Sequence, residues 1–238
     1  MLWTDDFLFL HFPKTAGKSL THALVQTLGR PMTCVVSKGQ VRELADYSHT
    51  DLTIIEGWAH ENMKAAERRL LKYDKTLDGF KAIIVGIRNP NDLMVSNYFF
   101  MRKTYEHNRE KENFRIAMEN DFEGYAEKVM VEPIQNWMTI NGKRPENLRI
   151  IRFEHLQDDY DTLADEFGFS ATVVPHINSS EHDHYLSYLT PKAEEAIYKK
   201  FQYLFMEGFY ERQSLSFYSP TPEDQPEDQG ATGTGRHF

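Results

Sequence analysis

Cysteine is nearly absent from this chain of 238 residues, which contains a single one, Cys34. A disulfide within the chain is therefore impossible, and a cluster of cysteine thiolates cannot hold a metal ion. A domain of this length buries roughly 70% of the surface of its unfolded chain, so it does not need such cross-links to be stable. A reducing compartment, the cytoplasm, is the expected location.

Long hydrophobic runs are also missing. The longest apolar stretches lie around residues 7–12 and 82–87, far short of the ~18 residues of a membrane-spanning helix. The chain starts with an acidic segment that includes Asp5 and Asp6, whereas a secretory signal starts with basic residues. We therefore expect neither a membrane span nor a signal peptide.

Positive charge is scarce, because 27 lysines and arginines face 36 aspartates and glutamates, for a net charge of −9. Proteins with a general affinity for nucleic acid or anionic membranes carry the opposite balance. Nucleic acid is therefore not an expected partner. An anionic ligand would have to be bound by a local cluster of basic groups.

Apolar runs that alternate with amphipathic stretches indicate the fold class. The alternation predicts an α/β fold: a single P-loop-like domain with a mostly parallel central sheet and helices on both faces. Residues 1–218 form this domain, whereas 219–238, an acidic and glycine-rich segment, cannot bury enough apolar surface to fold and is predicted to be disordered. We expect strands at 7–12, 33–36, 51–58, 81–88 and 148–153, and helices at 19–28, 61–73, 91–107, 158–167 and 190–210.

The junction between the first strand and the first helix has the composition of a phosphate-binding loop. Small residues at a helix N-terminus allow several backbone N–H groups to converge on an anion. The segment nearly matches the nucleoside-triphosphate loop Gly-x-x-x-x-Gly-Lys-Ser/Thr, except that Phe12 occupies the first glycine position. It reads Pro13-Lys14-Thr15-Ala16-Gly17-Lys18-Ser19-Leu20.

A second anion-binding signal follows the strand at 81–88. Arg88 ends this strand, at the edge where open α/β sheets bind ligands, and Ser96 lies eight residues later on the next helix. An arginine fork and a hydroxyl are suited to a terminal phosphate. The structural alternative is that Arg88 pairs with Asp92 and that Ser96 caps a turn.

Both segments resemble those of sulfotransferases that use 3′-phosphoadenosine 5′-phosphosulfate (PAPS). The stretch 11–20 is most similar to the carbohydrate O-sulfotransferases of the heparan/chondroitin 2-O type, with Ala16 and Lys18 in place of a glycine and a threonine. The resemblance implies PAPS as the sulfuryl donor, no required metal, and a hydroxyl-bearing acceptor, with a carbohydrate as the expected class. It assigns the 5′-phosphosulfate to Lys14, Thr15, Ala16, Gly17, Lys18, Ser19 and Leu20, and the 3′-phosphate to Arg88 and Ser96.

Sulfuryl transfer also needs a group beside the leaving oxygen and a base for the acceptor hydroxyl. Lys14 is the expected leaving-group stabiliser. His60 is the first candidate for the base, because Gly57-x-x-His60 resembles the element that supplies a catalytic histidine in the 2-O branch. Glu56 is its main rival, and His11 is expected to support the loop.

Two other functions fit the same residues. A P-loop kinase or NTPase would use Lys18 and Ser19 with Mg²⁺, and Glu56 as the acidic metal ligand. A nucleotide-binding domain without catalysis would bind the ligand but transfer no sulfate. The sequence carries no signal for the oligomeric state.

Overall fold

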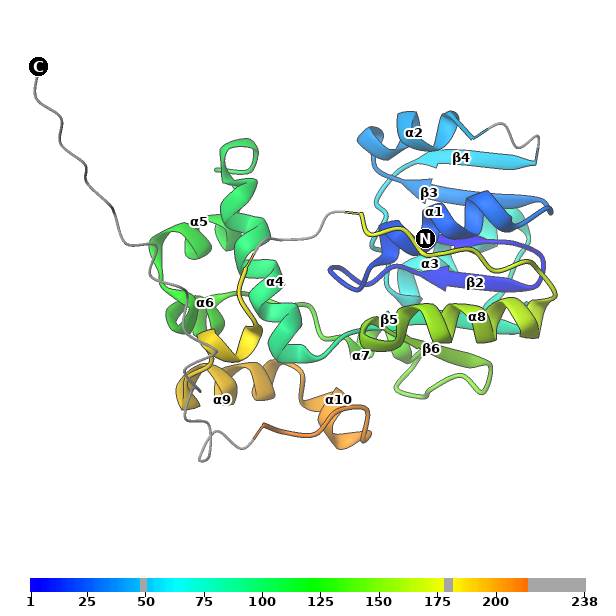
Figure 1. Cartoon of the computed structure of the whole chain (residues 1–238). Coiled ribbons are helices and arrows are strands. Elements are labelled where there is room, and N and C mark those ends of the chain that lie inside the picture. The colour runs from blue at the N-terminus through cyan, green and yellow to red at the C-terminus, as the bar shows by residue number, and fades with distance from the viewer. Residues whose placement is uncertain (48–50, 178–181, 214–238) are drawn as a thin grey trace, which may run out of the picture.

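The structure is a computed structural model that describes residues 1–47, 51–177 and 182–213 (Figure 1). The predicted disordered tail, 219–238, lies outside these residues. The described strands form one six-stranded sheet in the order β4-β3-β1-β2-β5-β6. Their bounds are Leu2–Trp3 for β1, Phe7–Leu10 for β2, Met32–Val36 for β3, Leu52–Glu56 for β4, Ala82–Ile87 for β5 and Leu148–Arg152 for β6.

The sheet is mostly parallel, as the alternation of strands and helices predicts. Strands β2, β5 and β6 pair in parallel, as do β3 and β4. Among the strands of the described residues, only the short β1 is antiparallel, and it pairs with both β2 and β3. The sequence does not reveal β1, because two residues are too few to show a periodicity.

Helices cover both faces of the sheet, which confirms that part of the prediction. Phe7 and Phe9 of β2 pack on one side with α1 (Gly17–Thr27), α2 (Lys38–Ala45) and α8 (Leu156–Phe167). Leu8 and Leu10 pack on the opposite side, where α3 (Met63–Leu70) contributes to the core. In Figure 1, α1 and α8 lie in front of the sheet and α3 lies behind it.

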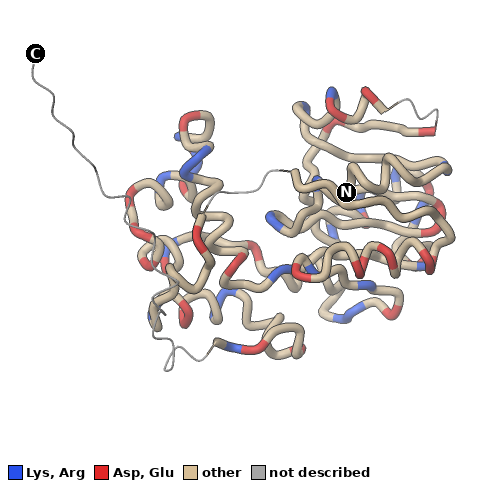
Figure 2. The backbone as a smooth tube through the Cα atoms, viewed as in Figure 1, with Lys and Arg blue, Asp and Glu red and all other residues tan. Residues whose placement is uncertain are grey.

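A helical lobe stands beside the sheet and shares the core of its α3 side (Figure 1). Positions of lysine and arginine are interspersed with those of aspartate and glutamate along both parts of the chain (Figure 2). Within the described ranges, no helix is both long enough and apolar enough to cross a bilayer. The lobe consists of α4 (Pro90–Lys103), α5 (Glu112–Glu119), α6 (Phe122–Lys128), α9 (Pro191–Lys200) and α10 (Gln202–Met206), whereas α7 (Gln135–Met138) packs against α3 at the sheet. Short 3₁₀ turns span Leu71–Tyr73, Leu77–Gly79, Tyr105–His107, Phe153–His155 and Tyr185–Tyr188.

The predicted final helix, 190–210, is wrong as a continuous element. Its start is as expected, since Thr190 caps α9 and accepts a hydrogen bond from the amide of Ala193 at 3.1 Å. The helix breaks at Phe201, which leaves the helical conformation (φ −115°) while its ring is fully buried. Burial of this ring in the core thus outweighs the helical periodicity on either side of it.

Candidate active site

The loop between β2 and α1 has a strained backbone. Lys14 and Ala16 have φ angles of 66° and 58°, a left-handed conformation that costs about 1–2 kcal/mol for a residue with a Cβ. Contacts with neighbouring groups hold the loop in this shape. The hydroxyl of the buried Thr15 donates to the carbonyl of Phe12 at 2.8 Å. Thr15 also packs on Gly86 of β5, where an added Cβ would lie 2.8 Å from its Oγ1.

His11 supports the loop from the sheet side. Its ring is 9% exposed, and a Cβ on Gly17 would lie only 1.8 Å from its Cδ2 atom. The close approach therefore requires glycine at the first position of α1. The first amides of this helix have no carbonyl partner within the helix, so they are available to bind an anion.

Lys14 carries the main positive charge of the loop. Its ammonium lies 4.4 Å from the centre of the Phe100 ring. Burial, together with repulsion from Arg88 and Lys103, lowers the pKa of Lys14 to about 8. A bound anion would relieve both effects, because it would compensate for the lost hydration and for the neighbouring positive charges.

Arg88 follows β5 directly and is 8% exposed. Its Nε donates to Asp92 at 2.7 Å, so the ion pair considered as the structural alternative is present. The same guanidinium also donates through Nη1 to the carbonyl oxygen of Lys14 at 3.1 Å. It lies over the ring of Phe153, 3.9 Å from the ring centre. Asp92 and Phe153 therefore orient Arg88 toward the loop.

A cavity of about 720 Å³ opens over the loop and brings most of the predicted residues together. Thr15 and Leu20 are buried beside it but do not line it, and Glu56 is exposed outside it. In the described part of the chain, no cluster of three or more His, Cys, Asp or Glu residues is arranged to hold a metal ion. The predicted residues in the lining are Lys14, Ala16, Gly17, Lys18, Ser19, His60, Arg88 and Ser96, together with His11.

His60 has a defined tautomer. Its Nδ1 lies 3.0 Å from the carbonyl oxygen of His11, and a carbonyl oxygen only accepts, so Nδ1 carries the hydrogen. The neutral ring then presents Nε2 as a proton acceptor. Burial lowers the pKa of His60 below its usual 6.5, which keeps the ring neutral at pH 7.

Two walls of the cavity are not evident from the sequence. Residues 173–177 cross the start of α1, and the amide of Ile177 donates to the hydroxyl of Ser19 at 3.2 Å. On the α2 side, Glu43 pairs with Lys18 at 2.7 Å, which offsets part of the charge that Lys18 adds to the loop. Neither contact follows from a motif, since each joins segments that are distant in the sequence.

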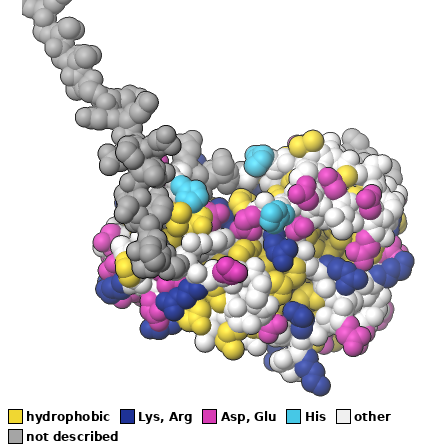
Figure 3. Space-filling model, turned by 60° about the horizontal axis from the view of Figure 1, so that its bottom comes forward, with side chains coloured by type: hydrophobic (Ala, Val, Ile, Leu, Met, Phe, Trp, Pro, Cys, Tyr) yellow, Lys and Arg dark blue, Asp and Glu magenta, His cyan; other side chains and the backbone are white. Residues whose placement is uncertain are grey.

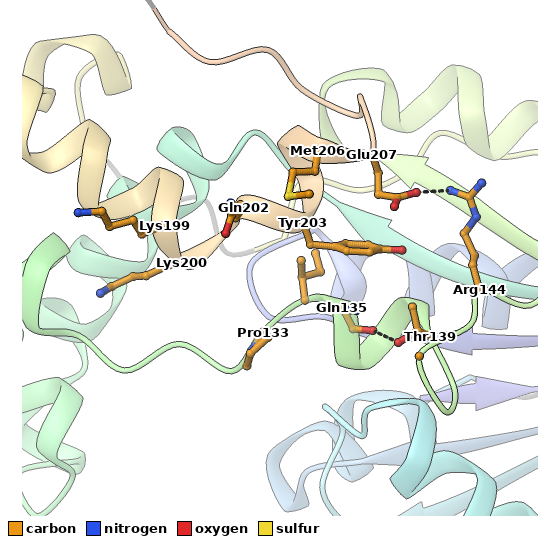
Figure 4. A pocket seen from close by; sticks show the side chains of 12 residues that line it. Pro133, Gln135, Thr139, Arg144, Lys199, Lys200, Gln202, Tyr203, Met206 and Glu207 are labelled. Atoms are coloured by element: carbon orange, nitrogen blue, oxygen red, sulfur yellow. Dashed lines mark hydrogen bonds and ion pairs between the residues drawn. The ribbon is translucent and has the colours of Figure 1, made fainter.

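A second cavity, of about 770 Å³, lies between α7 and the α9–α10 region (Figure 4). Each of its basic side chains already has a partner: Arg144 pairs with Glu207 at 3.3 Å, Lys199 pairs with Glu195 at 3.3 Å, and Lys200 donates to the carbonyl of Glu127 at 2.9 Å. None of the predicted site residues lines this cavity. The face in Figure 3 mixes acidic and basic side chains around a hydrophobic centre, so no broad basic surface appears there.

Comparisons with known proteins identify the family and the fold of the chain. Residues 3–166 match the family model described as a sulfotransferase domain. The fold is similar to that of the mouse sulfotransferase SULT7A1 complexed with PAP, with a TM-score of 0.51. That similarity spans 86% of this chain and 85% of the mouse chain at 14% sequence identity, so it supports the fold alone. No curated protein matches the sequence.

Proposed function

Since the chain belongs to the sulfotransferase family, we propose that it transfers a sulfuryl group from PAPS to a hydroxyl group of a carbohydrate. The observation that carries the proposal is the hydrogen bond from Arg88 to the carbonyl of Lys14, at 3.1 Å. Because of this contact, the two predicted anion-binding elements border one cavity. A single ligand with two phosphate groups, adenosine 3′,5′-bisphosphate with or without its sulfuryl group, suits that arrangement.

The loop is assigned to the 5′ end of the donor. The first amides of α1 bind the 5′-phosphate, and Lys14 lies beside the oxygen that joins phosphorus to sulfur. When the bond between sulfur and that oxygen breaks, the oxygen keeps the electron pair, and the ammonium of Lys14 stabilises the new negative charge. Arg88 and Ser96 are assigned to the 3′-phosphate.

His60 is assigned as the base. The acceptor oxygen forms a bond to sulfur on the side opposite the leaving oxygen, and its proton passes to Nε2 of His60. The hydrogen bond from Nδ1 to the carbonyl of His11 keeps Nε2 available for this proton. Glu56 stays the rival, although its exposed side chain does not line the cavity. The carbohydrate acceptor rests on the similarity of residues 11–20 to the 2-O branch, and the cytoplasmic location stays a prediction.

A thermal unfolding experiment tests the donor assignment. Adenosine 3′,5′-bisphosphate without Mg²⁺ is expected to raise the Tm more than Mg·ATP does, and more than adenosine 5′-monophosphate, which lacks the 3′-phosphate. In Arg88→Met the advantage of the bisphosphate over the monophosphate is expected to disappear, because the partner of the 3′-phosphate is gone. A larger shift with Mg·ATP would support a P-loop kinase instead. Transfer of labelled sulfate from PAPS to saccharides separates an active enzyme from a binding domain.

A further inference from the structure

Trp58 is the one tryptophan that faces solvent, with 66% of its surface exposed, whereas Trp3 and Trp137 are 2% exposed. A single exposed apolar side chain is common on protein surfaces and indicates nothing alone. Here, however, the indole packs against His60: the ring centres lie 5.3 Å apart and the planes are inclined by 73°. The exposed ring therefore lies next to the proposed base.

His60 lies between this indole and the donor cavity. It lines the cavity together with Lys14, and its ring also contacts Trp58. In-line transfer places the acceptor on the side of the sulfuryl group opposite the leaving phosphate. A molecule that rests on Trp58 thus has its hydroxyl groups close to the proton-accepting ring.

A cluster of polar side chains begins four residues after Trp58, at Asn62. Asn62, two residues beyond His60, donates through its side-chain amide to Glu132 at 2.6 Å. Asn136 donates to the same carboxylate oxygen at 3.2 Å, and Glu132 and Asn136 are both exposed. Amide and carboxylate groups form hydrogen bonds with hydroxyls. An apolar acceptor, such as a steroid, would lack the enclosed apolar pocket that such ligands fill, because Trp58 is exposed.

We propose that Trp58 is the stacking platform of an acceptor subsite that binds a sugar ring. The apolar face of the ring packs on the indole, and hydroxyl groups at its edge bind the amides and the carboxylate around Asn62 and Glu132. This inference rests on the proposed sulfuryl transfer, and it adds the residue that selects a saccharide over an apolar alcohol.

Fluorescence provides a test that does not depend on turnover. Because Trp3 and Trp137 are buried, acrylamide quenches mainly Trp58. The protein is saturated with adenosine 3′,5′-bisphosphate and titrated with unsulfated chondroitin hexasaccharide, with cellohexaose and with 4-nitrobenzyl alcohol. At least one of the two oligosaccharides is expected to protect the emission from quenching. Protection by neither oligosaccharide would overturn the proposal.

Kinetics with matched variants locates the subsite. Trp58→Ala is expected to raise KM for the protecting oligosaccharide about tenfold, which is the range of aromatic stacking contacts. Trp58→Phe keeps an aromatic ring, so its KM is expected to lie between those of the wild type and Trp58→Ala. The KM for PAPS and the stabilisation by the bisphosphate stay as in the wild type. Met206→Ala is the control, since Met206 is 73% exposed and lines the second cavity.

The outcomes separate this inference from the proposed function. An unchanged KM in Trp58→Ala, or a raised KM in Met206→Ala alone, would overturn the saccharide platform while sulfuryl transfer remains. Transfer to 4-nitrobenzyl alcohol but to neither oligosaccharide would do the same. Failure of the bisphosphate to stabilise the wild type would instead contradict the donor assignment.

Discussion

The pKa of Lys14 leads to a quantitative prediction for ligand binding. In the free protein this pKa is about 8, because burial and the charges of Arg88 and Lys103 disfavour the ammonium. A bound 5′-phosphate favours the ammonium and returns the pKa toward its ordinary value of 10.5. Binding of adenosine 3′,5′-bisphosphate then takes up a proton wherever free Lys14 is neutral, which is above pH 8.

The sign and size follow from this linkage. At pH 7 about nine-tenths of free Lys14 is already charged, whereas at pH 9 only about one-tenth is. The Kd is therefore expected to rise about tenfold from pH 7 to pH 9, a loss of about 1.4 kcal/mol of binding free energy. Isothermal titration calorimetry at constant ionic strength measures the Kd and, from buffers of different ionisation enthalpy, the proton uptake.

Two variants serve as controls for this pH dependence. Lys14→Arg keeps its charge over the whole range, so its Kd is expected to be flat from pH 7 to pH 9. Lys14→Met is expected to bind more weakly at pH 7 and to be equally flat, with a larger loss in kcat than in binding of PAPS. A wild-type Kd that does not change over this range, or a Lys14→Met variant with the wild-type slope, would refute the reasoning.

Three further predictions concern the proposed base, the backbone of the loop, and Glu43. His60→Ala is expected to lower kcat by about 10²–10⁴-fold and to remove the acid limb of the pH–rate profile, whose pKa lies below 6.5. Glu56→Gln is expected to change kcat little. The reverse pattern in the two variants would make Glu56 the base. In urea denaturation, Ala16→Gly is expected to leave the free energy of unfolding unchanged or to raise it by up to about 1 kcal/mol. Gly17→Ala is expected to lower both the free energy of unfolding and the affinity for the bisphosphate. Wild-type stability and affinity in Gly17→Ala would argue against a tightly supported loop. Glu43→Gln is expected to tighten bisphosphate binding a few-fold at low salt but not at high salt, and no change at low salt would show that this carboxylate does not weaken the site.

The central strands and the positions of the two candidate anion-binding segments were predictable because each has a local signal. The apolar runs at 7–12 and 82–87 become β2 and β5, which lie side by side and bring their following loops together. The position of Arg88 directly after β5 was predictable from the end of the apolar run. Its hydrogen bond to Lys14, across 74 residues, appears only in the folded chain.

Features that depend on long-range packing were not predictable. Helix α2 buries only Leu44, so its sequence shows little helical periodicity. Segment 173–177 forms a wall of the cavity through a contact between residues 158 positions apart, from Ile177 to Ser19. The partnership of Lys18 with Glu43 likewise joins two helices. In each case a tertiary contact, rather than a local pattern, decides the position of the residue.

A crystal structure of the protein with adenosine 3′,5′-bisphosphate tests the account most directly. We expect the 5′-phosphate on the first amides of α1 beside the Lys14 ammonium, and the 3′-phosphate of the same molecule on Arg88 and Ser96. A nucleotide bound elsewhere, or one whose 3′-phosphate points away from Arg88, would contradict the assignment.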